Sequence, residues 1–222
     1  MLKVGVVVFP GSNCDLDALR AIKKVMNCTA VPLWHMDSEI NTDAVILPGG
    51  FSYGDYLRPG AIATHSSIMK AVKLFAENGG PVIGICNGFQ ILTESRLLPG
   101  TLLTNNSTRF ISKNMTLNTV TQRTPFTKLF KPNQQITIPI AHKDGNYQAD
   151  STTLAELKAN DQIVFKYDNN PNGSIENIAG ICNKEGNVLG MMPHPERAIS
   201  KWTQSSDGKL VFNSLLQFLE AK

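Results

Sequence analysis

The chain has 222 residues and a formal net charge of +3 at pH 7, the balance of 21 basic and 18 acidic side chains. Its hydrophobic content of 42% excludes a disordered chain, and no apolar stretch reaches the roughly 18 residues that a membrane-spanning helix requires. The basic side chains are scattered, so the charge pattern argues against nucleic-acid binding. The length suits one domain, and we expect a single domain over residues 1–222.

Cysteine usage and the N-terminal segment predict a cytoplasmic protein. The apolar run at residues 4–9 is too short for a secretory signal and is broken by Pro10. The spacing of the four cysteines matches neither a disulfide framework nor a zinc site, and no metal is expected. They are Cys14, Cys28, Cys86 and Cys182.

The first half of the chain alternates short apolar runs with helical patterns. Strands are predicted over residues 4–9, 29–34, 44–47 and 81–85. Helices are predicted over residues 66–77 and after Ser12, which we expect to be an N-cap with Asp15 and Asp17 in the first turn. The apolar positions of that first helix are Leu16, Leu19, Ile22, Val25 and Met26. This alternation predicts an α/β fold, an open and mostly parallel sheet with helices on both faces.

The second half is richer in threonine, asparagine and β-branched residues. Antiparallel strands are predicted near residues 116–121 and 135–140, added beside the main sheet. Further strands are predicted at 163–167, 178–182 and 188–192, with a short helix at 154–158. A final amphipathic helix is predicted from the spacing of Leu210, Leu215, Leu216 and Leu219.

A Gly-x-Cys-x-Gly motif lies where a predicted strand meets a helix. Cys86 is flanked by Gly84 and Gly88, as in the sharp turn that exposes a hydrolase nucleophile. The backbone N–H of Asn87 would face the same space as the sulfur, and the helix N-terminus favours a thiolate. A buried structural cysteine is the alternative, but the strand–turn–helix context favours catalysis.

A cysteine nucleophile needs a base, and His194 is the best candidate among the four histidines. Pro193 and Pro195 restrict its backbone, and the carboxylate of Glu196 can orient the ring. His35 and His65 lie beside apolar segments, where a packing or surface role is more common, whereas His142 ends a predicted strand and could line a cleft. Together with Cys86, these residues predict a Cys-His-Glu group.

A third motif, Pro48-Gly49-Gly50, ends a predicted strand. A backbone N–H of Gly50 together with that of Asn87 would form a two-donor oxyanion hole. An ordinary turn at the end of the strand explains the tripeptide equally well.

These three motifs, in this order, resemble those of the class I glutamine amidotransferases, in which such a triad hydrolyses glutamine to glutamate and ammonia. The resemblance implies a flavodoxin-like fold with Cys86 as nucleophile, His194 as general base and then acid, and Glu196 as the orienting carboxylate. It also implies that glutamine is held by Gly50, Phe51, Gln90, Arg109 and Phe110.

Longer segments narrow the resemblance to one subfamily, the small glutaminase subunits of phosphoribosylformylglycinamidine synthases. They are residues 5–15, 49–58, 167–173 and 177–181. The subfamily implies two partners: a large ATP-dependent synthetase subunit, together with a small bridging subunit. No cofactor is expected in this chain, which contains no P-loop motif, and ATP and Mg are expected in the synthetase.

The chain departs from the subfamily at residues 142–145, which read His-Lys-Asp-Gly instead of His-Gly-Glu-Gly. A hairpin turn at Asp144 and Gly145 would explain this segment.

Two other functions are compatible with the motifs: a glutaminase subunit of another amidotransferase complex, and a catalytically silent scaffold that regulates a partner. The complete triad argues against the scaffold.

Overall fold

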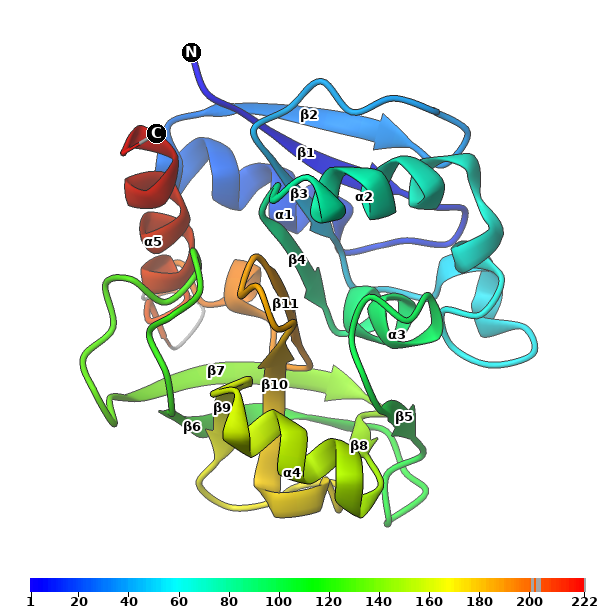
Figure 1. Cartoon of the computed structure of the whole chain (residues 1–222), viewed down its shortest axis with the longest axis vertical. Coiled ribbons are helices and arrows are strands. Elements are labelled where there is room, and N and C mark those ends of the chain that lie inside the picture. Colours follow the sequence, from blue (N-terminus) through cyan, green and yellow to red (C-terminus); the bar gives the residue numbers. More distant parts are fainter. Residues whose placement is uncertain (201, 203–204, 222) are drawn as a thin grey trace.

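The computed structural model describes residues 1–200, 202 and 205–221. Within these residues, the strands form a nine-stranded sheet, ordered β2-β1-β3-β4-β11-β10-β9-β6-β7, and a two-stranded sheet of β5 and β8 (Figure 1). The strands are β1 (Lys3–Val8), β2 (Thr29–Trp34), β3 (Ala44–Leu47), β4 (Val82–Ile85), β5 (Thr101–Leu103), β6 (Ile111–Thr119), β7 (Gln135–His142), β8 (Asn146–Gln148), β9 (Ile163–Tyr167), β10 (Ile178–Cys182) and β11 (Val188–Met191). The α-helices are α1 (Asp15–Ala21), α2 (Ser67–Glu77), α3 (Asn87–Glu94), α4 (Ser151–Ala159) and α5 (Lys209–Glu220), and shorter helical turns are η1 (Ile22–Met26), η2 (Ser52–Asp55), η3 (Ala63–His65), η4 (Ile175–Asn177) and η5 (Pro195–Arg197).

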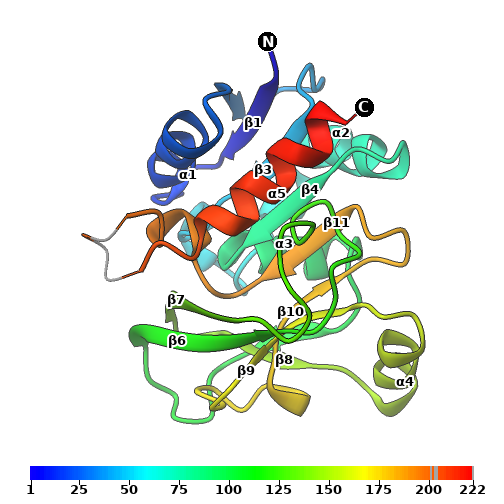
Figure 2. The same ribbon diagram turned by 90° about the vertical axis from the view of Figure 1, so that its left-hand side faces the viewer.

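The first half of the large sheet is parallel, as the continuous apolar runs predict. The strands β2, β1, β3, β4 and β11 all pair in parallel, and every residue of β3, β4 and β11 is buried. Figure 2 shows α1 and α2 on opposite sides of this part of the sheet. In a parallel sheet covered on both faces, the carboxyl ends of the central strands are where ligands bind. The ends of β3, β4 and β11 are therefore the place to look for a site.

The second half of the sheet is antiparallel and turns across the first. From β11 onward, each strand pairs antiparallel with the next, in the order β10, β9, β6 and β7. In Figure 1, β6 and β7 run crosswise to β4 and β10. The edge strand β7 thereby reaches the ends of β4 and β11. The contact is a 2.8 Å hydrogen bond from the backbone N–H of His194, just after β11, to the carbonyl oxygen of Pro139 in β7. The added antiparallel strands are confirmed, and they belong to the same sheet.

The predicted start of the first helix is wrong. Ser12 is not its N-cap, because α1 begins at Asp15 and Cys14 occupies the N-cap position without a side-chain cap. The turn at Gly11, where φ is 85°, instead brings Ser12 into a backbone bridge with Gly50 and delays the helix. Leu16 is consequently 58% exposed, whereas Ala18 and Ile22 of the following turn face the core.

The predicted hairpin at Asp144 and Gly145 is also wrong. The strand β8, which follows this turn, pairs with β5 and not with β7. The residues between β7 and β8 therefore redirect the chain from one sheet to the other.

In the described part of the chain, no helix has the length and hydropathy of a membrane span.

Candidate active site

Cys86 occupies the sharp turn between β4 and α3. Its backbone is left-handed, with φ 52° and ψ −105°, a costly conformation for a residue with a Cβ. The turn is possible because the flanking glycines are in close contact: a Cβ on Gly84 would lie 2.5 Å from the carbonyl oxygen of Gly88. The backbone N–H of Cys86 donates to Met191 at 2.8 Å, which fixes the turn to the end of β11. The sharp turn expected between the strand and the helix is present.

His194 and Glu196 form a buried pair beside this turn. His194 Nδ1 and Glu196 Oε1 are 2.6 Å apart, and both side chains are nearly inaccessible to solvent. Among the described residues, His194 Nε2 has no hydrogen-bond partner. The carboxylate therefore fixes one ring nitrogen, and the other is left available for a substrate or for a sulfur.

Gly49 shows that His194 and Cys86 face each other. A Cβ at this glycine would lie 2.7 Å from His194 Cε1, 3.2 Å from Cys14 Sγ and 3.4 Å from Cys86 Cβ. The side chains of Cys86 and His194 thus converge on one point at the end of β3, and only a residue without a side chain fits between them.

The electrostatics of this cluster favour a charged imidazole. Burial by itself lowers the pKa of His194, but the Glu196 carboxylate and then Cys86 outweigh it and hold the pKa well above its ordinary value. His142, in the same cavity, has its pKa lowered to about 4 by burial and by the charge of His194. His194 is therefore poised to carry a proton, and His142 stays neutral.

The triad opens into a cavity of about 150 Å³. Of the residues predicted to hold glutamine, Gly50, Phe51, Gln90 and Phe110 line it, but Arg109 does not. Arg109 is exposed, and its described contacts are made through its backbone. The other lining residues are Asn13, Cys14, Asp55, Cys86, Ala141, His142, His194 and Arg197.

The loop after β7 holds Gln90, one of the residues that line this cavity. The backbone carbonyl of Asp144 accepts a 2.6 Å hydrogen bond from Gln90 Nε2. Asn105 Oδ1 accepts from the N–H of Gly145 at 3.1 Å and lies 3.1 Å from His142 Nδ1. The segment that departs from the subfamily pattern thus holds Gln90 through a main-chain carbonyl, a contact that does not use the side chain at position 144.

Sequence reasoning missed a second cysteine at the triad. Cys14 Sγ lies 3.1 Å from Arg197 Nη2, and Arg197 also pairs with Asp17 at 3.2 Å. The donor atoms of Cys14, His194 and Glu196 lie within 4.8 Å of one another, a set that could hold a metal ion. The signal in the sequence is the Asn13-Cys14 pair directly before α1, within the subfamily-like residues 5–15.

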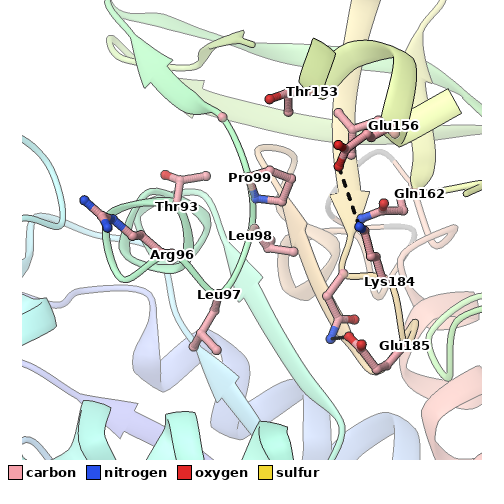
Figure 3. A pocket seen from close by; sticks show the side chains of 13 residues that line it. Thr93, Arg96, Leu97, Leu98, Pro99, Thr153, Glu156, Gln162, Lys184 and Glu185 are labelled. Carbon is pink, nitrogen blue, oxygen red and sulfur yellow. Dashed lines mark hydrogen bonds and ion pairs between the residues drawn. The ribbon is translucent and has the colours of Figure 1, made fainter. Parts of the chain in front are cut away.

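A larger hollow of about 380 Å³ lies elsewhere (Figure 3). Arg96, Glu156 and Lys184 are on its wall, and Glu156 pairs with Lys184 at 3.6 Å. Its lining contains none of the triad residues. The smaller cavity over Cys86 is therefore the candidate active site.

The chain is similar in sequence and in structure to known glutamine amidotransferases. A chain of the PurLQS structure from Thermotoga maritima is 44% identical, with a TM-score of 0.89 over 98% of this chain and 99% of that one. Two more distant structures share the fold: a candidate GMP synthase subunit from Thermoplasma acidophilum (15% identity, TM-score 0.67, 100% and 95% coverage) and a glutamine amidotransferase from Thermotoga maritima (16%, 0.58, 99% and 90%). The model of the CobB/CobQ-like glutamine amidotransferase domain matches residues 1–214, and this chain belongs to that family of enzymes.

Proposed function

We propose that this chain is the glutaminase subunit of a phosphoribosylformylglycinamidine synthase. The observation that carries the proposal is the strained Cys86 elbow facing the buried pair of His194 and Glu196 within one cavity. The 44% identity to a PurLQS chain supports the subfamily over other amidotransferases. The distinctive residues 49–58 and 167–173 support the same choice.

The reaction begins when the Cys86 thiolate attacks the carboxamide carbon of glutamine. A sulfur–carbon bond forms, and the carbonyl oxygen takes up negative charge in a tetrahedral intermediate. His194 then gives its proton to the leaving nitrogen, the carbon–nitrogen bond breaks, and ammonia leaves behind a thiol ester. Glu196 balances the charge of His194 and keeps Nε2 directed at the reacting atoms.

Water completes the cycle. His194, now neutral, takes a proton from a water molecule whose oxygen attacks the thiol-ester carbon. The sulfur–carbon bond breaks, glutamate is released and Cys86 returns to the thiolate. In both halves, the backbone N–H groups of Gly50 and Asn87 stabilise the negative oxygen as the oxyanion hole.

The ammonia is consumed by a different chain. The sequence contains no P-loop motif for ATP, so a partner must activate the acceptor. We infer a large ATP- and Mg-dependent synthetase subunit, which converts formylglycinamide ribonucleotide to formylglycinamidine ribonucleotide, and a small bridging subunit. The similarity to a chain of PurLQS supports an assembly of this kind.

Two experiments test the proposal. A glutamine analogue with an electrophilic carbon, 6-diazo-5-oxo-L-norleucine, should add one label to the complex, and peptide mass spectrometry should place it on Cys86. Complementation of glutaminase-deficient purine, GMP, arginine–pyrimidine and tryptophan auxotrophs then identifies the pathway. Growth of only the purine auxotroph supports the subfamily. Growth of another instead, or labelling outside Cys86, overturns the proposal.

A further inference from the structure

The cavity over Cys86 contains a carboxylate, that of Asp55, with no ion-pair partner in the part of the chain that the structure describes. Among the described residues, Asp55 makes no ion pair, and its side-chain contact is a 3.2 Å hydrogen bond from Asn87 Nδ2. Arg197, a cation that lines the same cavity, is instead paired with Asp17 at 3.2 Å. Because an unpaired charge in a partly closed site costs free energy, Asp55 is open to a cation that arrives with a ligand.

Asn87 brings a second acceptor to the same place. Its Nδ2 also donates to Gln90 Oε1, at 2.9 Å, so the oxygens of Asp55 and Gln90 surround a single amide nitrogen. Two further bonds fix the orientation of both amides. The backbone N–H of Ser52 donates to Asn87 Oδ1 at 3.1 Å, and Gln90 Nε2 donates to the carbonyl oxygen of Asp144. The orientation of both amide groups is therefore fixed. The carboxylate of Asp55 and Gln90 Oε1 together form an oxygen-lined corner of the cavity.

The fold keeps this acid in a costly position. Tyr53, Asp55 and Leu57 all have left-handed backbone conformations, with φ of 52°, 54° and 69°. Burial, together with the nearby charge of Asp144, raises the pKa of Asp55 to about 6, although the bond from Asn87 lowers it. Strained backbone and an under-stabilised charge at one residue are typical of a binding site rather than of a structural turn.

We infer that Asp55, together with Gln90 Oε1, binds the α-ammonium group of glutamine. This inference rests on the proposed glutaminase function and adds the group that recognises the amino-acid end of the substrate. An ammonium group has three donors and a positive charge, which match a carboxylate and an amide oxygen. Binding at this corner leaves the carboxamide end free to extend toward Cys86, which lines the same cavity. Asp55 thus selects a free α-amino acid amide over a simple carboxylic acid amide.

The test compares two substrates on two forms of the assembled complex. Glutaramate is glutamine without the α-amino group, and Asp55→Asn removes the charge while keeping an oxygen that accepts from Asn87. We expect Asp55→Asn to lower kcat/KM for glutamine by about tenfold to a hundredfold, the range for a hydrogen bond to a charged group. The same substitution should leave kcat/KM for glutaramate within about twofold, because the group that Asp55 binds is missing.

A matched variant separates recognition from loop stability. Arg58, in the same loop as Asp55, is held by Glu94 at 2.6 Å. Glu94→Gln loosens this anchor without changing the oxygen-lined corner, and it should affect glutamine and glutaramate by equal factors. If Asp55→Asn also changes kcat/KM for glutamine and for glutaramate by equal factors, the inference is overturned. An unchanged kcat/KM for glutamine would overturn it as well. A wild-type complex that hydrolyses neither amide would instead overturn the proposed function.

Discussion

Cys86 Sγ lies 3.7 Å from the carbonyl oxygen of Ala141, although the two residues come from opposite halves of the sheet. Four strands, β11, β10, β9 and β6, separate β4 from β7 in the sheet order. The contact exists because the antiparallel half turns across the end of the parallel half, as Figure 1 shows. The edge strand thereby covers a site that an open parallel sheet leaves exposed at the ends of its strands.

Replacing the nucleophile should separate the two activities of the complex. We expect Cys86→Ala to abolish glutamine-dependent synthesis and to preserve synthesis from free ammonia, because only the thiol ester requires the sulfur. Steady-state assays of the assembled complex with each nitrogen source measure this. An equal loss with both sources, in a complex that still assembles, contradicts the division of labour between the chains.

The two other triad residues should differ in importance. His194→Ala removes the group that moves the proton, a contribution of about 10²–10⁴ in rate. Glu196→Gln keeps an acceptor 2.6 Å from His194 Nδ1 and removes only the charge, so we expect a smaller loss of kcat. Equal losses in parallel kcat measurements would indicate that Glu196 takes part directly in proton transfer.

The sequence predicted the parts of the site that depend on local structure. The elbow follows from a buried strand, two glycines and a helix, and the structure places Cys86 at that turn. The predicted β9 and β10 agree with the structure at both ends because their apolar runs are sharply bounded. Such features require only the chain's own neighbours in sequence.

The residues that the sequence missed depend on distant contacts. Cys14 becomes part of the site only because Gly50 bridges Ser12 and brings the start of α1 to the end of β3. Asp55 becomes part of it through Asn87, 32 residues later. No periodicity encodes these pairings, and Arg109 was placed in the cavity by resemblance alone.

Gly49 should be intolerant of any side chain. A methyl group there would lie 2.7 Å from His194 Cε1, and overpacking of this kind costs about 1–3 kcal/mol. We expect Gly49→Ala to lower kcat about a hundredfold, because it separates His194 from Cys86. The assay is run well below the Tm, determined by calorimetry. A lower Tm with an unchanged kcat would show that Gly49 matters only for packing.

Removing the charge of Asp55 should stabilise the isolated chain. The pKa of Asp55 is raised to about 6, so the folded state binds its proton more tightly than the unfolded state, and ionisation is destabilising. The penalty is absent below about pH 4, grows between about pH 4 and 6, and is complete above that range. Because solvent reaches this half-buried side chain, we expect about 1 kcal/mol, or a rise in Tm of about 2–4 °C for Asp55→Asn at pH 7.5.

Thermal unfolding at several pH values tests this expectation. The difference in Tm between Asp55→Asn and the wild type should shrink steadily as the pH falls from about 6 to 4. Asp168→Asn is a suitable control, because this exposed acid lies outside the cavity and should give no comparable trend. A destabilised Asp55→Asn chain at neutral pH would show that the carboxylate serves the fold.

Partner docking should control the glutaminase. Free ammonia in water is protonated and diluted, so uncoupled hydrolysis would waste glutamine. We expect feeble activity from the isolated chain and strong stimulation by the synthetase with its nucleotide bound. The left-handed backbone of Tyr53, Asp55 and Leu57 near the cavity provides a segment that docking can reorganise. Full activity of the purified chain alone would contradict this control.

Leu57 offers a way to find where that docking acts. It is 91% exposed, in the loop that carries Asp55, and a large exposed apolar side chain next to a cavity is typical of a partner contact. We expect Leu57→Asp to reduce stimulation by the synthetase at least tenfold while leaving the feeble activity of the isolated chain unchanged. Leu74→Asp, on α2 and 59% exposed, is the matched control and should be stimulated normally. Equal stimulation of both variants in a titration with synthetase would place the docking surface elsewhere, since the charge at Leu57 would then meet no apolar partner.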